Sequence, residues 1–324
     1  MKRILVTGGA GFIGSGFIRH LLKKSESIVV YNLDKLTYAG DLERLRDIES
    51  DKRHRFVKGD VCDEDVVNNV FSKGIDTVIH FCAESHVDRS ISNQRPFEMT
   101  NVRGTLTILE GARRFGVEKF IHISTDEVYG ELGGNGQFYE TSSIRPNSPY
   151  AASKAAGDFF VNSYRHTYKL PTMIIRPSNN YGPFQYPEKL IPVVISRARD
   201  NKPVPVYANG ENVREWLYVD DCIEGIFSLL NKGKIGEIYN IGSGQEKKNI
   251  DVVRKILSIL GKPEGLIEYV QDRPGHDFRY SLNTDKIKNE VGFRAETTFE
   301  NGLEKTIKWY LENEWWWRKF IKVC

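Results

Sequence analysis

Three regularly spaced glycines follow an apolar run at the start of the chain. Residues Lys2–Thr7 read as a β-strand, and Gly8, Gly11 and Gly14 then open a helical pattern. Glycines at a strand-to-helix turn allow a backbone to approach a pyrophosphate closely, and the helix N-terminus offers N–H groups to the anion. The GxxGxxG spacing differs from the usual GxGxxG, and a turn that simply requires glycine would show the same pattern. The feature predicts a β-α unit suited to a dinucleotide.

Strand-like and helix-like segments alternate over the first half of the chain. Further strands are expected at 27–33, 55–58, 77–82, 119–124 and 173–176, and helices at 63–71, 100–115 and 149–168. Such alternation forms right-handed βαβ units around a parallel sheet. We therefore predict an α/β fold, a Rossmann-type doubly wound parallel sheet.

The pattern changes after residue 177, where prolines become denser and the segments shorter. We predict a dinucleotide-binding domain at 1–177 and a smaller C-terminal substrate-binding α/β lobe at 178–324. Residues 215–245 look able to return to the first domain. The aromatic residues near the end of the chain, Trp309, Tyr310, Trp315, Trp316 and Trp317, are expected to dock a C-terminal helix rather than to bind a ligand.

Composition excludes several classes of protein. The 46 basic and 43 acidic residues give a net charge of +3, too small a bias to indicate a nucleic-acid or membrane partner. No apolar run is long enough to span a membrane, and the N-terminus does not resemble a signal peptide. The cysteines at 62, 82, 222 and 324 lack metal-ligand spacing. We expect a cytoplasmic protein with reduced thiols and no metal.

Two carboxylates follow the second and third predicted strands. Asp34 comes 20 residues after Gly14, where a carboxylate can accept both ribose hydroxyls of NAD. It would repel a 2′-phosphate, which favours NAD over NADP, although the adjacent Lys35 weakens this preference. Asp60 is placed to face the adenine edge, or to cap the strand end.

Tyr150 and Lys154 lie four residues apart on a predicted helix and so share one face. A tyrosine can act as a base near neutral pH only if its pKa falls by about three units, which requires roughly 4 kcal/mol. A neighbouring ammonium and an oxidised nicotinamide would both favour the phenolate. Alone, the pair could be an ordinary surface contact, but with the glycine turn and Asp34 it indicates a redox site.

Many stretches in order along the whole chain resemble the extended short-chain dehydrogenase/reductase family, and within it the dTDP-glucose 4,6-dehydratases. They are TGGAGFIGS (7–15), DKLTYAG (34–40), AESHVDRSI (83–91), STDEVYG (124–130), SPYAASKA (148–155), NNYGP (179–183), PEKLIP (187–192), REWLYVDD (214–221), YNIG (239–242) and DRPGHDFRY (272–280). The resemblance makes the second lobe a sugar-nucleotide-binding domain. It also implies a homodimer, through a four-helix bundle of the helices at 100–115 and 149–168.

The resemblance implies a dehydratase reaction. A tightly bound NAD, regenerated in each cycle, oxidises C4 of a nucleotide-diphospho-glucose, water leaves across C5–C6, and hydride returns to C6. The product is a 4-keto-6-deoxy sugar nucleotide of deoxysugar biosynthesis, as in the rhamnose pathway. The resemblance makes dTDP-glucose the expected substrate. UDP-glucose is the alternative, since the two bases differ by one methyl group, which is worth about 1–3 kcal/mol of selectivity in a pocket.

The family pattern assigns the chemistry to five residues. Tyr150, tuned by Lys154, is the base at O4, with Thr125 beside it as a hydrogen-bonding hydroxyl. Glu127 is the base at C5 and Asp126 the acid at the C6 hydroxyl, because hydroxide leaves poorly without a proton. Sugar-nucleotide epimerases, decarboxylases and a non-catalytic NAD-sensing protein are the alternatives, and Asp126 discriminates best among them.

The resemblance also implies two sets of binding residues. The cofactor set comprises Gly8, Gly11, Phe12, Ile13, Gly14, Asp34, Lys35, Leu36, Thr37, Asp60, Val61, Phe81, Ala83, Ser85, Thr100, Tyr150, Lys154 and Asn180. The substrate set comprises Ser85, Thr125, Asp126, Glu127, Asn179, Lys189, Leu190, Pro205, Val206, Tyr207, Arg214, Asn249, Arg273 and His276.

Overall fold

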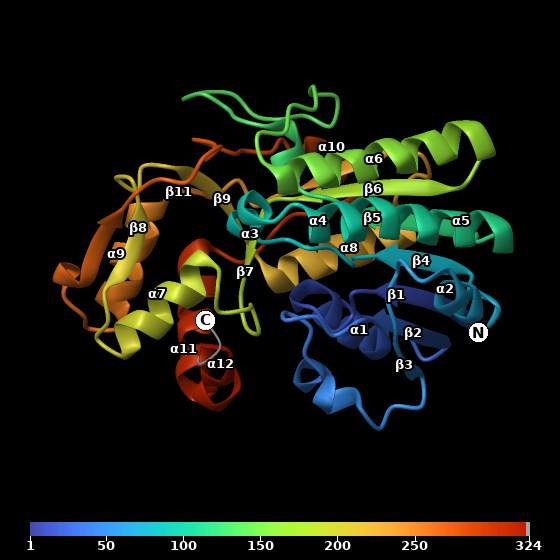
Figure 1. The fold of residues 1–324 in the computed structure, drawn as a ribbon, viewed down its shortest axis with the longest axis horizontal. Helices are drawn as coiled ribbons and strands as arrows, with labels where there is room; N and C mark the ends of the chain where they lie inside the picture. Colours follow the sequence, from blue (N-terminus) through green and yellow to red (C-terminus); the bar gives the residue numbers. More distant parts are fainter. Residues whose placement is uncertain (322–324) are drawn as a thin grey trace.

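The computed structural model describes residues 1–321, and its centre is a seven-stranded, fully parallel sheet (Figure 1). The strand order is β3-β2-β1-β4-β5-β6-β10. The chain adds strands outward on one side of β1 as far as β3, and then adds β4 and the later strands on the other side, so the order reverses between β1 and β4. The strands are β1 (Lys2–Thr7), β2 (Ile28–Asp34), β3 (His54–Lys58), β4 (Thr77–His80), β5 (Lys119–Ile123), β6 (Thr172–Pro177) and β10 (Ile238–Ile241). The predicted doubly wound parallel sheet is confirmed, and its reversal point is where such folds bind ligands.

Helices cover both faces of the sheet, as apolar strands such as β4 and β6 require. One face carries α1 (Phe12–Lys24), α8 (Val219–Lys232) and α10 (Asp285–Val291), which share a core with residues of β1, β2 and β6. The other carries α2 (Glu64–Phe71), α5 (Thr105–Phe115) and α6 (Pro149–Tyr168). Figure 1 shows α5 and α6 running alongside each other over β5 and β6.

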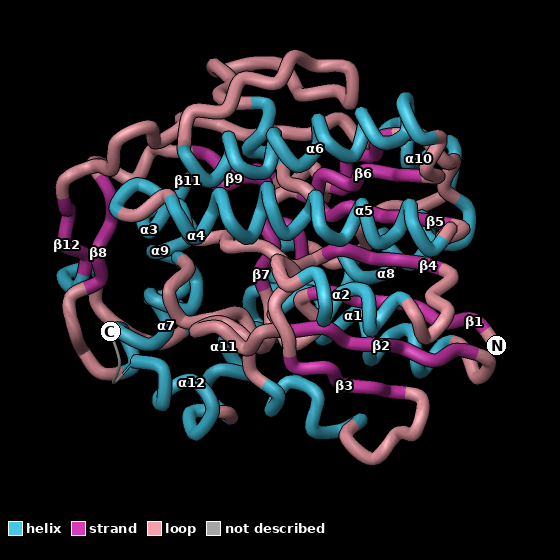
Figure 2. The backbone as a smooth tube through the Cα atoms, turned by 45° about the vertical axis from the view of Figure 1, so that its right-hand side comes forward, coloured by secondary structure: helices cyan, strands magenta, loops and turns pink. Residues whose placement is uncertain are grey.

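A second lobe has its own core and two small sheets (Figure 2). Its strands are β7 (Asn179–Tyr181), β9 (Val213–Tyr218) and β11 (Glu246–Lys248) in one sheet, and β8 (Val204–Tyr207) and β12 (Ile267–Val270) in the other. Its helices are α7 (Leu190–Arg199), α9 (Asn249–Ile259), α11 (Phe299–Glu312) and α12 (Glu314–Ile321). Short elements complete the chain: η1 (Leu42–Ile48), α3 (Val87–Ser92), α4 (Arg95–Phe97), η2 (Glu98–Gly104), η3 (Asp126–Tyr129) and η4 (Glu264–Leu266).

The aromatic tail is a docking surface, as expected. Tyr310, Trp316 and Trp317 are fully buried in the core of the second lobe, whereas Trp315 is 56% exposed. The indole N–H of Trp317 donates to the Tyr310 carbonyl at 2.7 Å. The aromatic run therefore fixes α12 against α11.

Two expected elements differ from the structure. The helix expected at 100–115 begins as a π-helix, η2, before it continues as α5. The wider turn suits buried Asn101, whose side chain pairs with the backbone N–H and carbonyl of Glu84 at 2.8 and 2.9 Å. The strand expected at 77–82 ends at His80, because β1 ends at Thr7. The N–H of Cys82 then donates to the Thr7 hydroxyl at 3.3 Å.

Some expectations concern absences. Across residues 1–321, no helix has both the length and the apolar character to cross a membrane. The same residues contain no cluster of three or more His, Cys, Asp or Glu side chains arranged to hold a metal ion. Cys62, Cys82 and Cys222 are free thiols, and Cys324 lies outside the described residues.

Candidate functional site

A cavity of about 300 Å³ opens at the carboxyl ends of β1 and β4, at the reversal point of the sheet. The glycine turn forms one wall and α6 another. Most of the expected cofactor residues line it: Gly8, Gly11, Phe12, Ile13, Gly14, Asp34, Thr37, Phe81, Ala83, Ser85, Tyr150, Lys154 and Asn180.

The glycine turn is shaped to accept an anion. Gly8 has φ +71°, and a Cβ there would lie 2.7 Å from the Cys82 nitrogen. At Gly14 a Cβ would meet the Gly8 carbonyl oxygen at 2.4 Å. Helix α1 starts without a side-chain cap or an acidic residue in its first turn. Its first N–H groups therefore remain for a pyrophosphate, and the turn fits a dinucleotide.

Asp34 is held at the end of β2 by two backbone groups. Its carboxylate accepts from the N–H of Ala10 at 2.9 Å and from that of Leu36 at 2.8 Å. Burial raises the pKa of Asp34, and these hydrogen bonds and the Arg44 guanidinium oppose the shift. Each oxygen keeps a lone pair, so the oriented carboxylate can accept two ribose hydroxyls.

Five expected cofactor residues are not among those that line the cavity. Lys35 and Asp60 form an ion pair at 2.5 Å. Leu36 takes a left-handed conformation, with φ +57°, behind Asp34. Val61 packs into the core under α2 and α5, and Thr100 lies on η2. The Lys35–Asp60 pair means that neither charge is free to act independently.

Helix α6 carries Tyr150 and Lys154 into the cavity, one turn apart. Pro149 at the first helical position and the Ser148 cap start this helix. The Lys154 ammonium donates to the Ile123 carbonyl at 2.7 Å, which fixes it at the end of β5. Burial lowers the pKa of Lys154 to about 8, and the Asp158 carboxylate one turn further along opposes this shift.

The phenol of Tyr150 is not pre-ionised by its protein surroundings. Burial raises its pKa, and the carboxylates of Glu127 and Asp126 raise it further, whereas the Thr125 hydroxyl lowers it. A cationic cofactor ring and the Lys154 ammonium must therefore outweigh burial before Tyr150 can act as a base.

Thr125, Asp126 and Glu127 form the start of η3, separated from the end of β5 only by Ser124. Thr125 caps η3 by accepting from the Glu127 N–H at 3.3 Å, and its hydroxyl donates to Asp126 at 3.1 Å. Asp126 is 2% exposed, and burial followed by the Glu127 and Glu215 carboxylates raises its pKa well above the ordinary value. A carboxyl whose pKa is raised in this way keeps its proton to higher pH than a free aspartate does, which suits it to act as an acid.

Nearby positive charges oppose the effect of burial on the pKa of Glu127 more strongly than they do for Asp126. Burial raises its pKa, but the Arg273 and Arg214 guanidinium groups and Lys189 oppose the rise. The neighbouring carboxyls Asp126 and Glu127 thus lie in different electrostatic environments, as the two members of an acid/base pair require.

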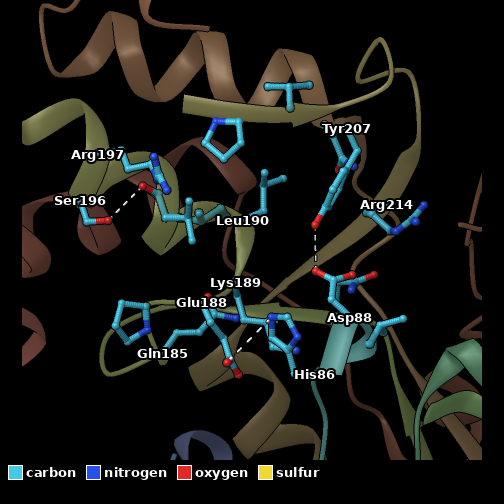
Figure 3. Close-up of a pocket in the computed structure, with 18 of the residues that line it drawn as sticks. His86, Asp88, Gln185, Glu188, Lys189, Leu190, Ser196, Arg197, Tyr207 and Arg214 are labelled. Carbon is cyan, nitrogen blue, oxygen red and sulfur yellow. Dashed lines mark hydrogen bonds and ion pairs between the residues drawn. The ribbon is translucent and has the colours of Figure 1, made fainter. Parts of the chain in front are cut away.

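A second cavity, of about 680 Å³, lies between the lobes (Figure 3). Glu127, Asn179 and Lys189 line both cavities, so the two meet at one catalytic candidate and two expected substrate residues. The other expected substrate residues in its lining are Leu190, Pro205, Val206, Tyr207, Arg214, Asn249, Arg273 and His276. Ser85, Thr125 and Asp126 lie in the first cavity.

The large cavity has cationic walls suited to a diphosphate. The Lys189 ammonium donates to the Ser85 carbonyl at 2.7 Å, and burial lowers its pKa. The Arg214 guanidinium is held by backbone carbonyls, including that of Asp277 at 2.9 Å. Asn249 Oδ1 and Arg273 Nε are buried with no hydrogen-bond partner within residues 1–321. These groups can bind a ligand's polar atoms.

The cavity linings include charged residues that were not predicted from the sequence, among them Asp88, Glu188 and Arg44. Asp88 accepts from the Tyr207 hydroxyl at 2.9 Å (Figure 3). It also pairs with Arg273 at 3.3 Å, so it positions two expected ligand residues. Glu188 accepts from the Tyr38 hydroxyl at 2.9 Å and pairs with Arg89 at 3.2 Å. Arg44 is buried beside the glycine turn. Asp88 and Glu188 lie in stretches that carry the family resemblance, which was the available signal.

Known proteins resemble this chain over nearly its whole length. The family model described as GDP-mannose 4,6 dehydratase matches residues 5–306. A probable dTDP-glucose 4,6-dehydratase of Sinorhizobium fredii is 49% identical over 333 residues, covering 98% of this chain and 95% of the relative. The dTDP-glucose 4,6-dehydratase of Escherichia coli is 47% identical, covering 98% and 96%.

A solved structure agrees with these matches. The structure of DesIV, a dTDP-glucose 4,6-dehydratase from Streptomyces venezuelae with NAD bound, superposes with a TM-score of 0.96. It is 46% identical, and the match covers 98% of this chain and 99% of DesIV.

Proposed function

Because this chain belongs to the dTDP-glucose 4,6-dehydratases of the extended short-chain dehydrogenase/reductase family, we propose that it converts dTDP-glucose to the 4-keto-6-deoxy sugar nucleotide and water. The observation that carries the proposal is the buried Asp126, whose raised pKa suits a proton donor, beside Glu127, whose burial is opposed by nearby positive charges. An epimerase or a decarboxylase needs no such added acid. A protein that only senses NAD would need neither carboxyl.

Each proton transfer of the proposed reaction is assigned to one side chain. NAD, when bound, supplies the oxidant that accepts hydride from C4 and later returns it to C6. Tyr150 accepts the proton from O4, with Lys154 stabilising the phenolate and Thr125 hydrogen-bonding the same oxygen. Glu127 removes the C5 proton, which the 4-keto group acidifies, and Asp126 protonates the departing C6 hydroxyl.

We propose that the larger cavity binds the nucleotide end. Lys189, Arg214 and Arg273 supply positive charge for the diphosphate, and Asn179 and Asn249 supply amide groups. Pro205, Val206, Tyr207 and Leu190 surround the base, and His276 reaches the ribose or phosphate. An apolar wall favours the thymine methyl group by about 1–3 kcal/mol over uracil.

The reaction is tested by turnover in deuterated water with dTDP-glucose and UDP-glucose in parallel. We expect a 4-keto-6-deoxy product that carries deuterium at C5, with dTDP-glucose preferred. Mass spectrometry and NMR of the product give both results. A C4 epimer formed without loss of water, or NAD binding without turnover of either sugar nucleotide, would contradict the proposal.

We propose that two copies associate through α5 and α6. Phe159 on α6 is 61% exposed and Phe115 on α5 is 41% exposed, which supports an apolar contact there. Phe159→Glu should convert a dimer to a monomer, because the contact would bury an unpaired charge. Light scattering after gel filtration measures this, with Tyr269→Glu, 55% exposed on β12, as the matched control. A monomeric parent protein, or a variant that remains dimeric, contradicts the proposal.

We further propose that the enzyme works in the cytoplasm and supplies deoxysugar synthesis, as in the rhamnose pathway. The free thiols of Cys62, Cys82 and Cys222 support a reducing compartment. A 4-keto-6-deoxy sugar nucleotide is a substrate for further epimerisation and reduction. Fractionation of cells followed by activity assays of each fraction tests the location.

A further inference from the structure

Arg44 joins three segments around the dinucleotide cavity. It lies on η1, after the loop that follows β2, and is 1% exposed. Its Nη1 donates to the carbonyls of Ala10, at 2.9 Å, and Ala39, at 2.6 Å, while its Nε donates to the Phe184 carbonyl at 3.1 Å. One side chain thus connects the glycine turn to the second lobe and to the loop at 35–41, which follows the expected ribose ligand Asp34 and which we call the ribose loop.

The C-terminal helix α12 packs onto the same group. The Arg44 guanidinium lies 5.0 Å from the centre of the Trp316 ring, and the Trp316 indole donates to Asp41 at 2.8 Å. Lys319 pairs with the same Asp41 oxygen at 2.7 Å. Asp41 also caps η1 by accepting from the Glu43 N–H. We call Asp41, Arg44, Trp316 and Lys319 the C-terminal clasp.

The clasp lies against the cofactor cavity. Arg44 is one of the residues that line it, and its charge acts on Asp34, the expected ribose ligand. Its Nη2 is buried and has no hydrogen-bond partner within residues 1–321. A buried guanidinium with an unused donor gains most from a ligand that completes its hydrogen bonds.

We propose that the C-terminal clasp retains NAD between turnovers, with Arg44 as a positioning residue for the glycine turn and the ribose loop. The inference rests on the proposed function, in which the cofactor returns to its starting oxidation state at the end of each cycle and need not be released. Retention requires the loop around the ribose to stay closed. Helix α12 supplies that restraint through its contacts with Arg44 and Asp41.

The experiment measures NADH dissociation from the loaded enzyme without any sugar nucleotide. Excess NAD displaces the NADH, and the loss of its fluorescence gives the rate. We expect Trp316→Phe, which removes one buried hydrogen bond, to release NADH roughly tenfold faster, and Arg44→Met, which removes three, to release it at least as fast. Trp315→Phe makes the matched change at the neighbouring exposed indole and should leave the rate unchanged. The two clasp variants should also lose turnover on dilution, because the cofactor dissociates, and added NAD should restore it.

Two results would contradict the proposal that the C-terminal clasp retains NAD. One is release from both Arg44→Met and Trp316→Phe at the parent rate. The other is an equal increase in Trp315→Phe, which has no clasp contact. If a core variant fails to fold, Lys319→Ala removes the Asp41 ion pair from a lysine side chain that is 41% exposed and should still speed release about twofold. Because no turnover is needed, a failed dehydratase assay leaves this test intact.

Discussion

Asp126→Asn is expected to stall the reaction after C4 oxidation. Its amide cannot protonate the departing C6 hydroxyl, so we expect elimination to slow roughly 10²–10⁴-fold, the usual contribution of a general acid. Oxidation at C4 should continue, because Tyr150 and Lys154 are unchanged. Reduced nicotinamide should therefore accumulate on the enzyme when dTDP-glucose is added, and its absorbance in a stopped-flow experiment measures this.

Glu127→Gln is the matched comparison, since it changes the neighbouring carboxyl in the same way. Both variants should accumulate reduced nicotinamide, but only Asp126→Asn should still exchange the C5 proton with deuterated water. If Asp126→Asn forms product at the parent rate, or forms no reduced nicotinamide, Asp126 is not the acid.

The pH dependence of the elimination rate tests the role of the Asp126 carboxyl independently. The acid must be protonated to work, and the pKa of Asp126 is raised by burial and by Glu127. Elimination should therefore lose rate as pH rises through that elevated pKa. The Asn variant should lack this alkaline decline, because no proton remains to be lost. A decline that persists unchanged in the variant would assign it to another group.

The sequence predicted the layered fold because its periodicities are local. The 3.6-residue period at 149–168 predicted α6 with its observed bounds, and the alternation of segments predicted the parallel sheet. The π-helix η2 was not predictable, because it depends on Asn101 meeting the Glu84 backbone 17 residues away.

The site shows the same division between local and distant contacts. The glycine turn and the Tyr150/Lys154 spacing are visible as short motifs. Arg44 carries no motif, and its role appears only when Trp316, far along the chain, packs on it. The direction of the Tyr150 pKa also required the fold, since Glu127 and Asp126 raise it together with burial.

Tyr150→Phe is expected to stop the reaction one step earlier than Asp126→Asn. Without the phenol, no base takes the O4 proton, so C4 oxidation should slow roughly 10²–10⁴-fold. No reduced nicotinamide should accumulate, although NAD binding should remain. Tyr168→Phe, on the same helix and 51% exposed, is the matched control and should behave as the parent. Rapid reduction of NAD by the Tyr150 variant would remove the phenol from the mechanism.

The carboxylates near Tyr150 also set the pH at which it works. The phenolate is the active form, so C4 oxidation should fall as pH decreases below the pKa of Tyr150. Because the Glu127 charge raises that pKa, Glu127→Gln should move the acid limb of C4 oxidation to lower pH, even though it blocks elimination. Loss of the Lys154 ammonium in Lys154→Met should move the limb to higher pH. Pre-steady-state reduction of NAD across a pH series separates these opposite shifts, and a shift of both variants in one direction would contradict the electrostatic account.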